Sequence, residues 1–116
     1  MKIINFDHMV LTVKNLDMSK NFYHEVIGLQ IIDEQKNNFV SLRCGNSLIR
    51  LRKLSNDANA IVANKLQTGV FDFCLETSAS INEVIDNFEH FGVTIAQGPI
   101  TKHGARQRLN DIGIRA

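Results

Sequence analysis

The first half of the chain is organised around the stretch Phe6-Asp7-His8-Met9-Val10-Leu11-Thr12-Val13, which lies within a largely apolar segment from Ile3 to Val13. Successive side chains of a strand point to opposite faces of its sheet. One face therefore carries Met9, Leu11 and Val13, and the other carries Phe6, His8, Val10 and Thr12. This alternation predicts a strand over residues 3–13 whose apolar face is covered by a helix.

The residues that follow predict this covering helix over 17–27. Asn15 or Asp17 can cap its first turn, because a short side-chain oxygen accepts a hydrogen bond from the free N–H groups there. Gly28 stands where a helix commonly ends in the left-handed conformation. The apolar side chains in between recur at helical spacing, at Met18, Phe22, Val26 and Ile27.

Three short strands are expected next, at Leu29–Glu34, Phe39–Cys44 and Ser47–Arg52, with hairpin-length connections between them. The first half then has the order β-α-β-β-β. A ferredoxin-like βαββαβ domain is the alternative, and it has only two strands between its helices. Because three strands are expected here, the βαβββ order is favoured.

The second half repeats much of this order. We expect a strand over Gly69–Thr77, then a helix over 80–91 that begins at a capping box formed by Ser80 and Glu83. A strand over Val93–Gln97 is expected to stop at Gly98-Pro99, and Ala105–Arg115 is expected to be extended.

An offset of 64 residues aligns the two halves, placing His8 on Asp72 and Gly28 on Gly92. The same polar position in both repeats indicates a duplicated module. The predicted organisation is one domain, with module one at 1–52, a linker at 53–68 and module two at 69–116.

Composition narrows the class of protein. A chain of 116 residues corresponds to one domain at about 150 residues each. Its net charge of +1 lacks the basic excess expected of a nucleic-acid binder. No run of ~18 apolar residues predicts a membrane span, and two cysteines form no disulfide framework. We therefore expect a small cytoplasmic protein that binds neither nucleic acid nor membrane.

The sequence resembles the vicinal oxygen chelate superfamily, which contains glyoxalases, bleomycin resistance proteins and extradiol dioxygenases, and is similar in particular to small glyoxalase-like virulence proteins. The resemblance covers nearly the whole chain. It implies an α+β fold of two βαβββ modules whose mixed sheet curls around a cavity, with the second module incomplete at its C-terminal end. The stretches that carry it are residues 6–17, Phe22-Tyr23, Ile27-Gly28-Leu29, Phe71-Asp72-Phe73-Cys74-Leu75 and Ile95-Ala96-Gln97-Gly98-Pro99.

The resemblance also implies a divalent metal held by residues of the first and fourth strands of each module. The first-strand positions are His8 and Asp72, and the fourth-strand position of module one falls near Arg52. A guanidinium stays protonated and cannot bind a metal. The family's last ligand is a glutamate after an Asp-Pro-Asp-Gly-Asn turn, and this chain ends at Ala116 before such a turn. We therefore predict weak or no metal binding here, with a divalent metal as the cofactor of a longer form.

Four further expectations concern the site. Arg50 and Arg52 share one strand face and can grip a carboxylate or phosphate, or simply form a solvated sheet face. Asp72 is a metal ligand or pairs with one of these arginines. His8 is a ligand or a hydrogen-bonded histidine of the cavity. Glu76 is the candidate general base.

Two functions stay open. One is a metal-dependent lyase or dioxygenase acting on a small oxygen-bearing metabolite, in which the metal polarises two neighbouring oxygens. The other is a protein that binds or sequesters a small molecule without chemistry. In either case we predict a homodimer, because a last strand that ends early leaves unpaired sheet edges.

Overall fold

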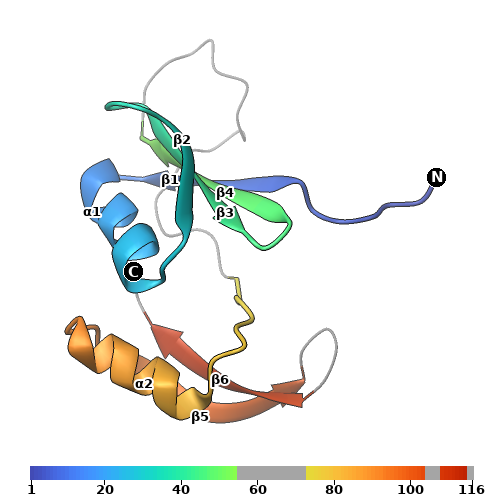
Figure 1. The fold of residues 1–116 in the computed structure, drawn as a ribbon, viewed down its shortest axis with the longest axis vertical. Helices are drawn as coiled ribbons and strands as arrows, with labels where there is room; N and C mark the ends of the chain where they lie inside the picture. The colour runs from blue at the N-terminus through green and yellow to red at the C-terminus, as the bar shows by residue number, and fades with distance from the viewer. Residues whose placement is uncertain (55–72, 104–107, 115–116) are drawn as a thin grey trace. The chain divides into compact units, whose positions relative to one another are not determined.

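The computed structural model describes residues 1–54, 73–103 and 108–114, including side chains over 1–54 and 73–100. It divides into two compact units, Met1–Phe73 and Cys74–Ala116 (Figure 1). Each unit is described by itself. The expected linker and the position of Asp72 lie outside the described residues.

The first unit contains a mixed four-stranded sheet. Its strands are β1 (His8–Val13), β2 (Gln30–Gln35), β3 (Phe39–Cys44) and β4 (Ser47–Lys53), in the spatial order β1-β4-β3-β2. β1 runs parallel to β4, whereas β3 is antiparallel to both β4 and β2. The α+β class is confirmed, and the β-α-β-β-β order expected for the first half is observed.

A single helical segment connects β1 to β2. It begins as α1 (Leu16–Asn21) and continues as a π-helical turn, η1 (Phe22–Val26). The Asn15 side chain, one of the two predicted caps, accepts a hydrogen bond of 3.0 Å from the Met18 N–H at the start of α1. Gly28 ends the segment with a φ of 89°, which a residue with a Cβ rarely adopts.

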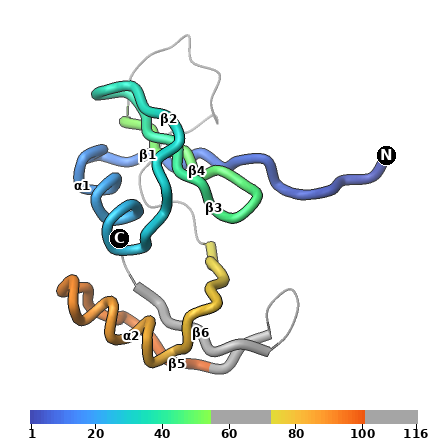
Figure 2. Tube along the Cα trace, in the orientation of Figure 1, coloured from blue at the N-terminus to red at the C-terminus, as the bar shows by residue number. Residues whose placement is uncertain are grey.

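Figure 2 shows the helical segment beside the sheet of this unit. The core lies between that segment and one face of the sheet, called here the helix face. Leu42 and Leu51 at its centre are fully buried, and the prediction that Leu11 lies under the helix is confirmed. The core cluster consists of Leu11, Leu16, Tyr23, Val40, Leu42, Ile49 and Leu51.

The first strand is shorter than the predicted 3–13. β4 begins at Ser47, and its first two residues still bind the chain just before β1. Ser47 Oγ donates a hydrogen bond of 2.6 Å to the Phe6 carbonyl, and the Leu48 N–H donates one of 2.9 Å to the Asp7 carbonyl. Residues 1–5 have no neighbouring strand among the described residues, so the strand begins at His8.

The second unit contains α2 (Ile81–His90) and a hairpin of β5 (Ile95–His103) with β6 (Arg108–Ile114). Ser80 caps α2 by accepting a hydrogen bond from the Glu83 N–H at 3.2 Å, and Gly92 follows with a φ of 71°. The prediction that Gly98-Pro99 stops the strand is wrong. β5 continues because its register shifts between Gln97 and Ile100, so Pro99, which lacks an N–H, is not required to pair.

The strand expected at Gly69–Thr77 falls partly outside the described residues, and the described part, 73–77, is not a regular strand. No helix in the described parts of the chain is long and apolar enough to cross a membrane.

Candidate functional site

The face of the sheet opposite the helix carries a different set of side chains, and we call it the arginine face. Residues paired across neighbouring strands point to the same face. The register therefore arranges the side chains of this face in three rows across β1, β4 and β3. Arg52 is the central residue of one row and Arg50 of another. The rows are Thr12–Arg52–Phe39, Val10–Arg50–Ser41 and His8–Leu48–Arg43.

Arg50 is held in place from two sides. Its Nε–H donates a hydrogen bond of 2.8 Å to Ser41 Oγ, and its guanidinium carbon lies 4.6 Å from the centre of the Phe39 ring. Ser41 is only 1% exposed, so its hydroxyl is satisfied by the arginine that covers it. The remaining guanidinium N–H groups of Arg50 form a fixed fork that matches a carboxylate or phosphate.

Arg52 stands two residues further along the same strand, so its Cα is roughly 7 Å from that of Arg50. Its side chain is half-buried, beside the buried Thr12. No ion pair between either arginine and a carboxylate occurs among the side chains of 1–54 and 73–100. β3 contributes a third arginine, Arg43, to this face. β2 contributes Asp33, which lies opposite Ser41.

His8 lies at the start of β1 and its side chain is half exposed. Its Nδ1 lies 2.8 Å from Asp7 Oδ2. Its partner on β4 is Leu48, which offers no ligand atom, and Arg52 lies about 13 Å further along that strand. The strand register thus pairs Arg52 with Thr12 and leaves it well separated from His8.

The described donors do not fit a metal centre. Over the described ranges, no three His, Cys, Asp or Glu side chains come together. Asp72 is outside these ranges, and Glu76 is an exposed residue of the second unit. Among the predicted site residues of the first unit, the structure thus places Arg50 and Arg52 on one strand face.

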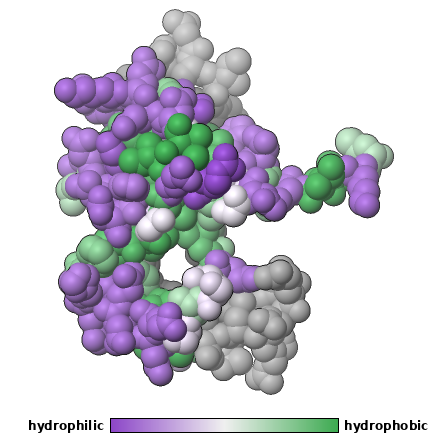
Figure 3. Space-filling model, in the orientation of Figure 1, coloured by the Kyte–Doolittle hydropathy of each residue, from purple (hydrophilic) through white to green (hydrophobic). Residues whose placement is uncertain are grey.

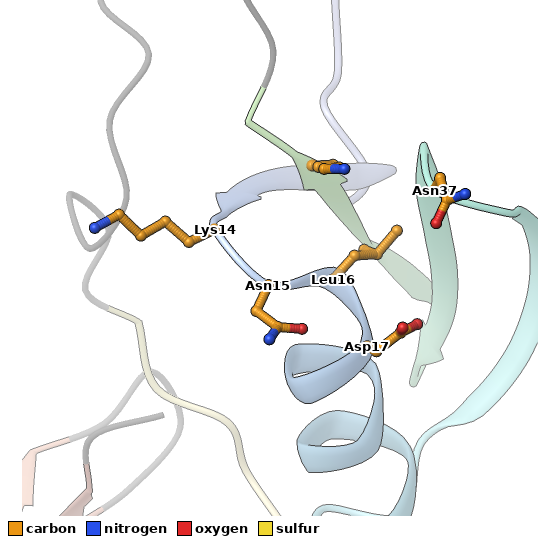
Figure 4. Close-up of a pocket in the computed structure, with 6 residues that line it drawn as sticks. Lys14, Asn15, Leu16, Asp17 and Asn37 are labelled. Carbon is orange, nitrogen blue, oxygen red and sulfur yellow. The ribbon is translucent and has the colours of Figure 1, made fainter.

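A shallow hollow of about 220 Å³ lies where β1, β4 and the β2–β3 turn meet the first turn of α1, and the sequence did not predict it. Asn15 on its wall already caps α1. In Figure 4 Lys14 points away from the other labelled side chains. The lining side chains are those of Lys14, Asn15, Leu16, Asp17, Asn37 and Lys53. Five of the six lining residues are polar or charged, and of these Asn15 is already engaged in the helix cap.

Two residues that position Arg50, namely Phe39 and Ser41, were also missing from the predicted site. A signal for Ser41 was available, because a two-residue turn at Gly45-Asn46 pairs Cys44 with Ser47 and, counting outward, Ser41 with Arg50.

Comparisons of the sequence and of the structure with known proteins agree on one family. The sequence pattern of the Glyoxalase/Bleomycin resistance protein/Dioxygenase superfamily matches residues 5–109. The chain is 31% identical over 115 residues to Virulence protein STM3117 of Salmonella typhimurium, covering 99% of this chain and 78% of that protein. The crystal structure of that protein superimposes with a TM-score of 0.87 at 32% identity, covering 99% of this chain and 90% of the other.

Two further solved structures share the fold. Integron cassette protein VCH_CASS1 from the mobile metagenome of V. cholerae has a TM-score of 0.87 at 30% identity, covering 99% of this chain and 88% of the other. TnmS3, an antibiotic binding protein from Streptomyces sp. CB03234, has a TM-score of 0.68 at 15% identity, covering 97% of this chain and 89% of the other. At that identity the second likeness concerns the fold alone.

Proposed function

The chain belongs to the Glyoxalase/Bleomycin resistance protein/Dioxygenase superfamily, and on that premise we propose that it binds a small anionic molecule on the arginine face. The ligand carries a carboxylate or a phosphate group. We propose binding or sequestration without chemistry as the function, which is one of the two that the sequence leaves open.

The observation that carries this proposal is the fixed position of Arg50. A free arginine loses side-chain entropy when it closes on a ligand. Here Ser41 and Phe39 already restrain the guanidinium at 2.8 Å and 4.6 Å, so much of that loss has been incurred on folding. A surface arginine without a role gains little from such restraint.

Arg52 supplies the second contact. Two guanidinium groups on one strand face, without a paired carboxylate among the described side chains, attract an anion and orient it by hydrogen bonds. The neighbouring Phe39 ring and Val10 offer apolar surface for the body of the ligand, since Phe39 is half-buried and lies in the row beside Arg50. The site therefore favours an anion with an aromatic or aliphatic body over inorganic phosphate alone.

A metal-dependent lyase or dioxygenase is the alternative function. Because the described donors do not assemble a metal site, no catalytic step is derived through a metal, and a role for Glu76 as a base stays a prediction. The same holds for a second, incomplete module, a cavity shared by two modules, a cytoplasmic location and a homodimer.

The proposal is tested by calorimetric titration of the full chain with benzoate and with inorganic phosphate. We expect benzoate to bind more tightly than phosphate, and Arg50→Met or Arg52→Met to weaken its binding. Lys36→Met removes one positive charge from the exposed β2–β3 turn and serves as the matched control. Binding that is equally weakened by Lys36→Met, or unaffected by both arginine substitutions, contradicts the proposal.

Metal binding is tested separately with Zn²⁺, Ni²⁺ and Mn²⁺. We predict weak or no binding to this chain, since a stable site needs several deprotonated ligands at coordination distance. Sub-micromolar affinity that disappears in His8→Ala would instead favour the metal-dependent enzyme.

A further inference from the structure

A bulge in β2 decides which way the acidic residues of that strand point. Ile31 pairs with Leu42 of β3. Asp33 pairs with Ser41, the residue adjacent to Leu42, so one extra residue of β2 lies between the two pairs. In an unbroken register Asp33 would pair with Val40 and point to the helix face. The bulge therefore moves Asp33 to the arginine face.

The neighbouring acid, Glu34, confirms these directions. Glu34 pairs with Val40, and its carboxylate accepts a hydrogen bond of 2.8 Å from Lys20 Nζ. Lys20 belongs to α1, so Glu34 lies on the helix face and Asp33, one residue earlier, lies on the opposite face. The two acids of β2 thus have separate surroundings, and only that of Glu34 is explained by packing against the helix.

The bulge leaves an apolar side chain in water. Its extra residue, Ile32, is 41% exposed, and Figure 3 shows hydrophobic surface over β2. Irregular register and charge protect an edge strand from further pairing, but a polar residue at the extra position would do so without exposing an isoleucine. Bulges also redirect side chains beside functional sites. The placement of Asp33 is the feature of β2 that this second role explains.

Asp33 stands at the end of the row that contains Arg50. Across the four strands this row runs Val10–Arg50–Ser41–Asp33. The Cα atoms of Arg50 and Asp33 are two strand spacings, roughly 10 Å, apart. Arg50 extends over the strand between them, because its Nε lies 2.8 Å from Ser41 Oγ. Among the described ion pairs there is none between Arg50 and Asp33, so the two charges are close enough to share one small ligand.

We infer that the ligand of the arginine face carries a protonated amine besides its anionic group, and that Asp33 selects this amine. The inference rests on the proposed function. Arg50 and Arg52 bind the carboxylate or phosphate group, and the Asp33 carboxylate accepts hydrogen bonds from the ammonium group. A negative charge at this place repels a second anionic group. The ligand class is therefore a zwitterion, an amino carboxylate or aminophosphate, rather than a dianion.

The test compares two ligands of the same shape by calorimetric titration of the full chain at neutral pH and low salt. In 3-(aminomethyl)benzoate a protonated amine replaces the terminal methyl group of 3-ethylbenzoate. We expect the wild type to bind the amine about fivefold more tightly, the upper range for an exposed charge pair. Asp33→Asn should remove this preference. Glu34→Gln makes the same change of charge on the helix face and should retain it.

The outcomes separate this inference from the anion site on which it rests. Equal affinity of the wild type for both ligands, or a preference that Glu34→Gln removes as fully as Asp33→Asn, overturns the inference and leaves the anion site standing. If 3-ethylbenzoate does not bind, or binds the wild type and Arg50→Met equally, the anion site fails and the inference fails with it.

A second measurement locates the amine on the face. The amide signals of the isotope-labelled full chain are followed during titration with each of the two ligands. We expect the signals of Asp33 and Ser41 to shift more with 3-(aminomethyl)benzoate than with 3-ethylbenzoate, and this difference to disappear in Asp33→Asn. Equal shifts with both ligands would show that the amine lies elsewhere and would overturn the role of Asp33.

Discussion

The helix face and the arginine face are built from alternate residues of the same strands, yet they have opposite chemistry. Val40, Leu42, Ile49 and Leu51 on the helix face are at most 2% exposed and wholly apolar. On the arginine face, Ser41 is equally buried but under the Arg50 side chain, and Arg52 lies beside Thr12. One face is thus committed to packing, which leaves the other free to carry a binding site.

Adjacent residues of β3 offer the largest contrast. Leu42→Ala leaves a cavity at the centre of the helix face and should lower the free energy of unfolding by about 2–5 kcal/mol. Ser41→Ala removes one hydrogen bond and should cost about 1 kcal/mol. Urea unfolding measures both changes. Equal losses would mean that the two faces contribute alike to packing.

On the arginine face, a substitution should change ligand affinity strongly and stability little. Arg52→Met keeps most of the side-chain volume and should change the free energy of unfolding by less than about 0.5 kcal/mol. It should weaken benzoate binding by about 10- to 100-fold, the value of one or two charge-assisted hydrogen bonds. Calorimetry on the wild type and the variant checks this. A variant that loses stability but keeps its affinity would assign Arg52 to packing.

The helix that covers the helix face depends on its cap. Asn15→Ala removes the acceptor of the Met18 N–H and should lower the free energy of unfolding by about 1 kcal/mol. Because Asn15 also lines the hollow at the end of β1, the same variant tests that hollow. Benzoate affinity should not change, and a loss of affinity would move the site from the arginine face to the hollow.

The smallest expected effect concerns pH. Burial raises the pKa of Tyr23, which belongs to the core on the helix face. The neutral phenol is favoured in the folded chain, so stability is constant below the unfolded value of about 10 and falls as pH rises above it. Tyr23→Phe should remove this fall. Since Tyr23 is the chain's single tyrosine, its ultraviolet absorbance reports the titration directly.

Much of the first unit could be predicted because its signals are local. Strand alternation assigned Leu11 to the core, and the capping side chains of Asn15 and Ser80 follow from short-range hydrogen bonding. The extent of β1 could not be predicted in this way. It depends on where β4 begins, and the apolar pattern of residues 3–6 gives no information about a partner strand.

The site residues, too, could be placed from the sequence only where the signal is local. Arg50 and Arg52 could be placed on one face from alternation alone, whereas the position beside His8 depends on the register of β1 with β4. That register is set by packing in three dimensions, and it places Leu48 there. The contact between Arg50 and Phe39 depends on side-chain conformation, which strand alternation does not specify.

We propose above that the arginine face binds a small anion. The most direct test is to follow the backbone amide signals of the isotope-labelled full chain during titration with benzoate. We expect the largest changes in Phe39–Arg43 and Leu48–Arg52, and we expect them to disappear in Arg50→Met. Changes centred on Lys14–Asp17, or changes that persist in Arg50→Met, would contradict it.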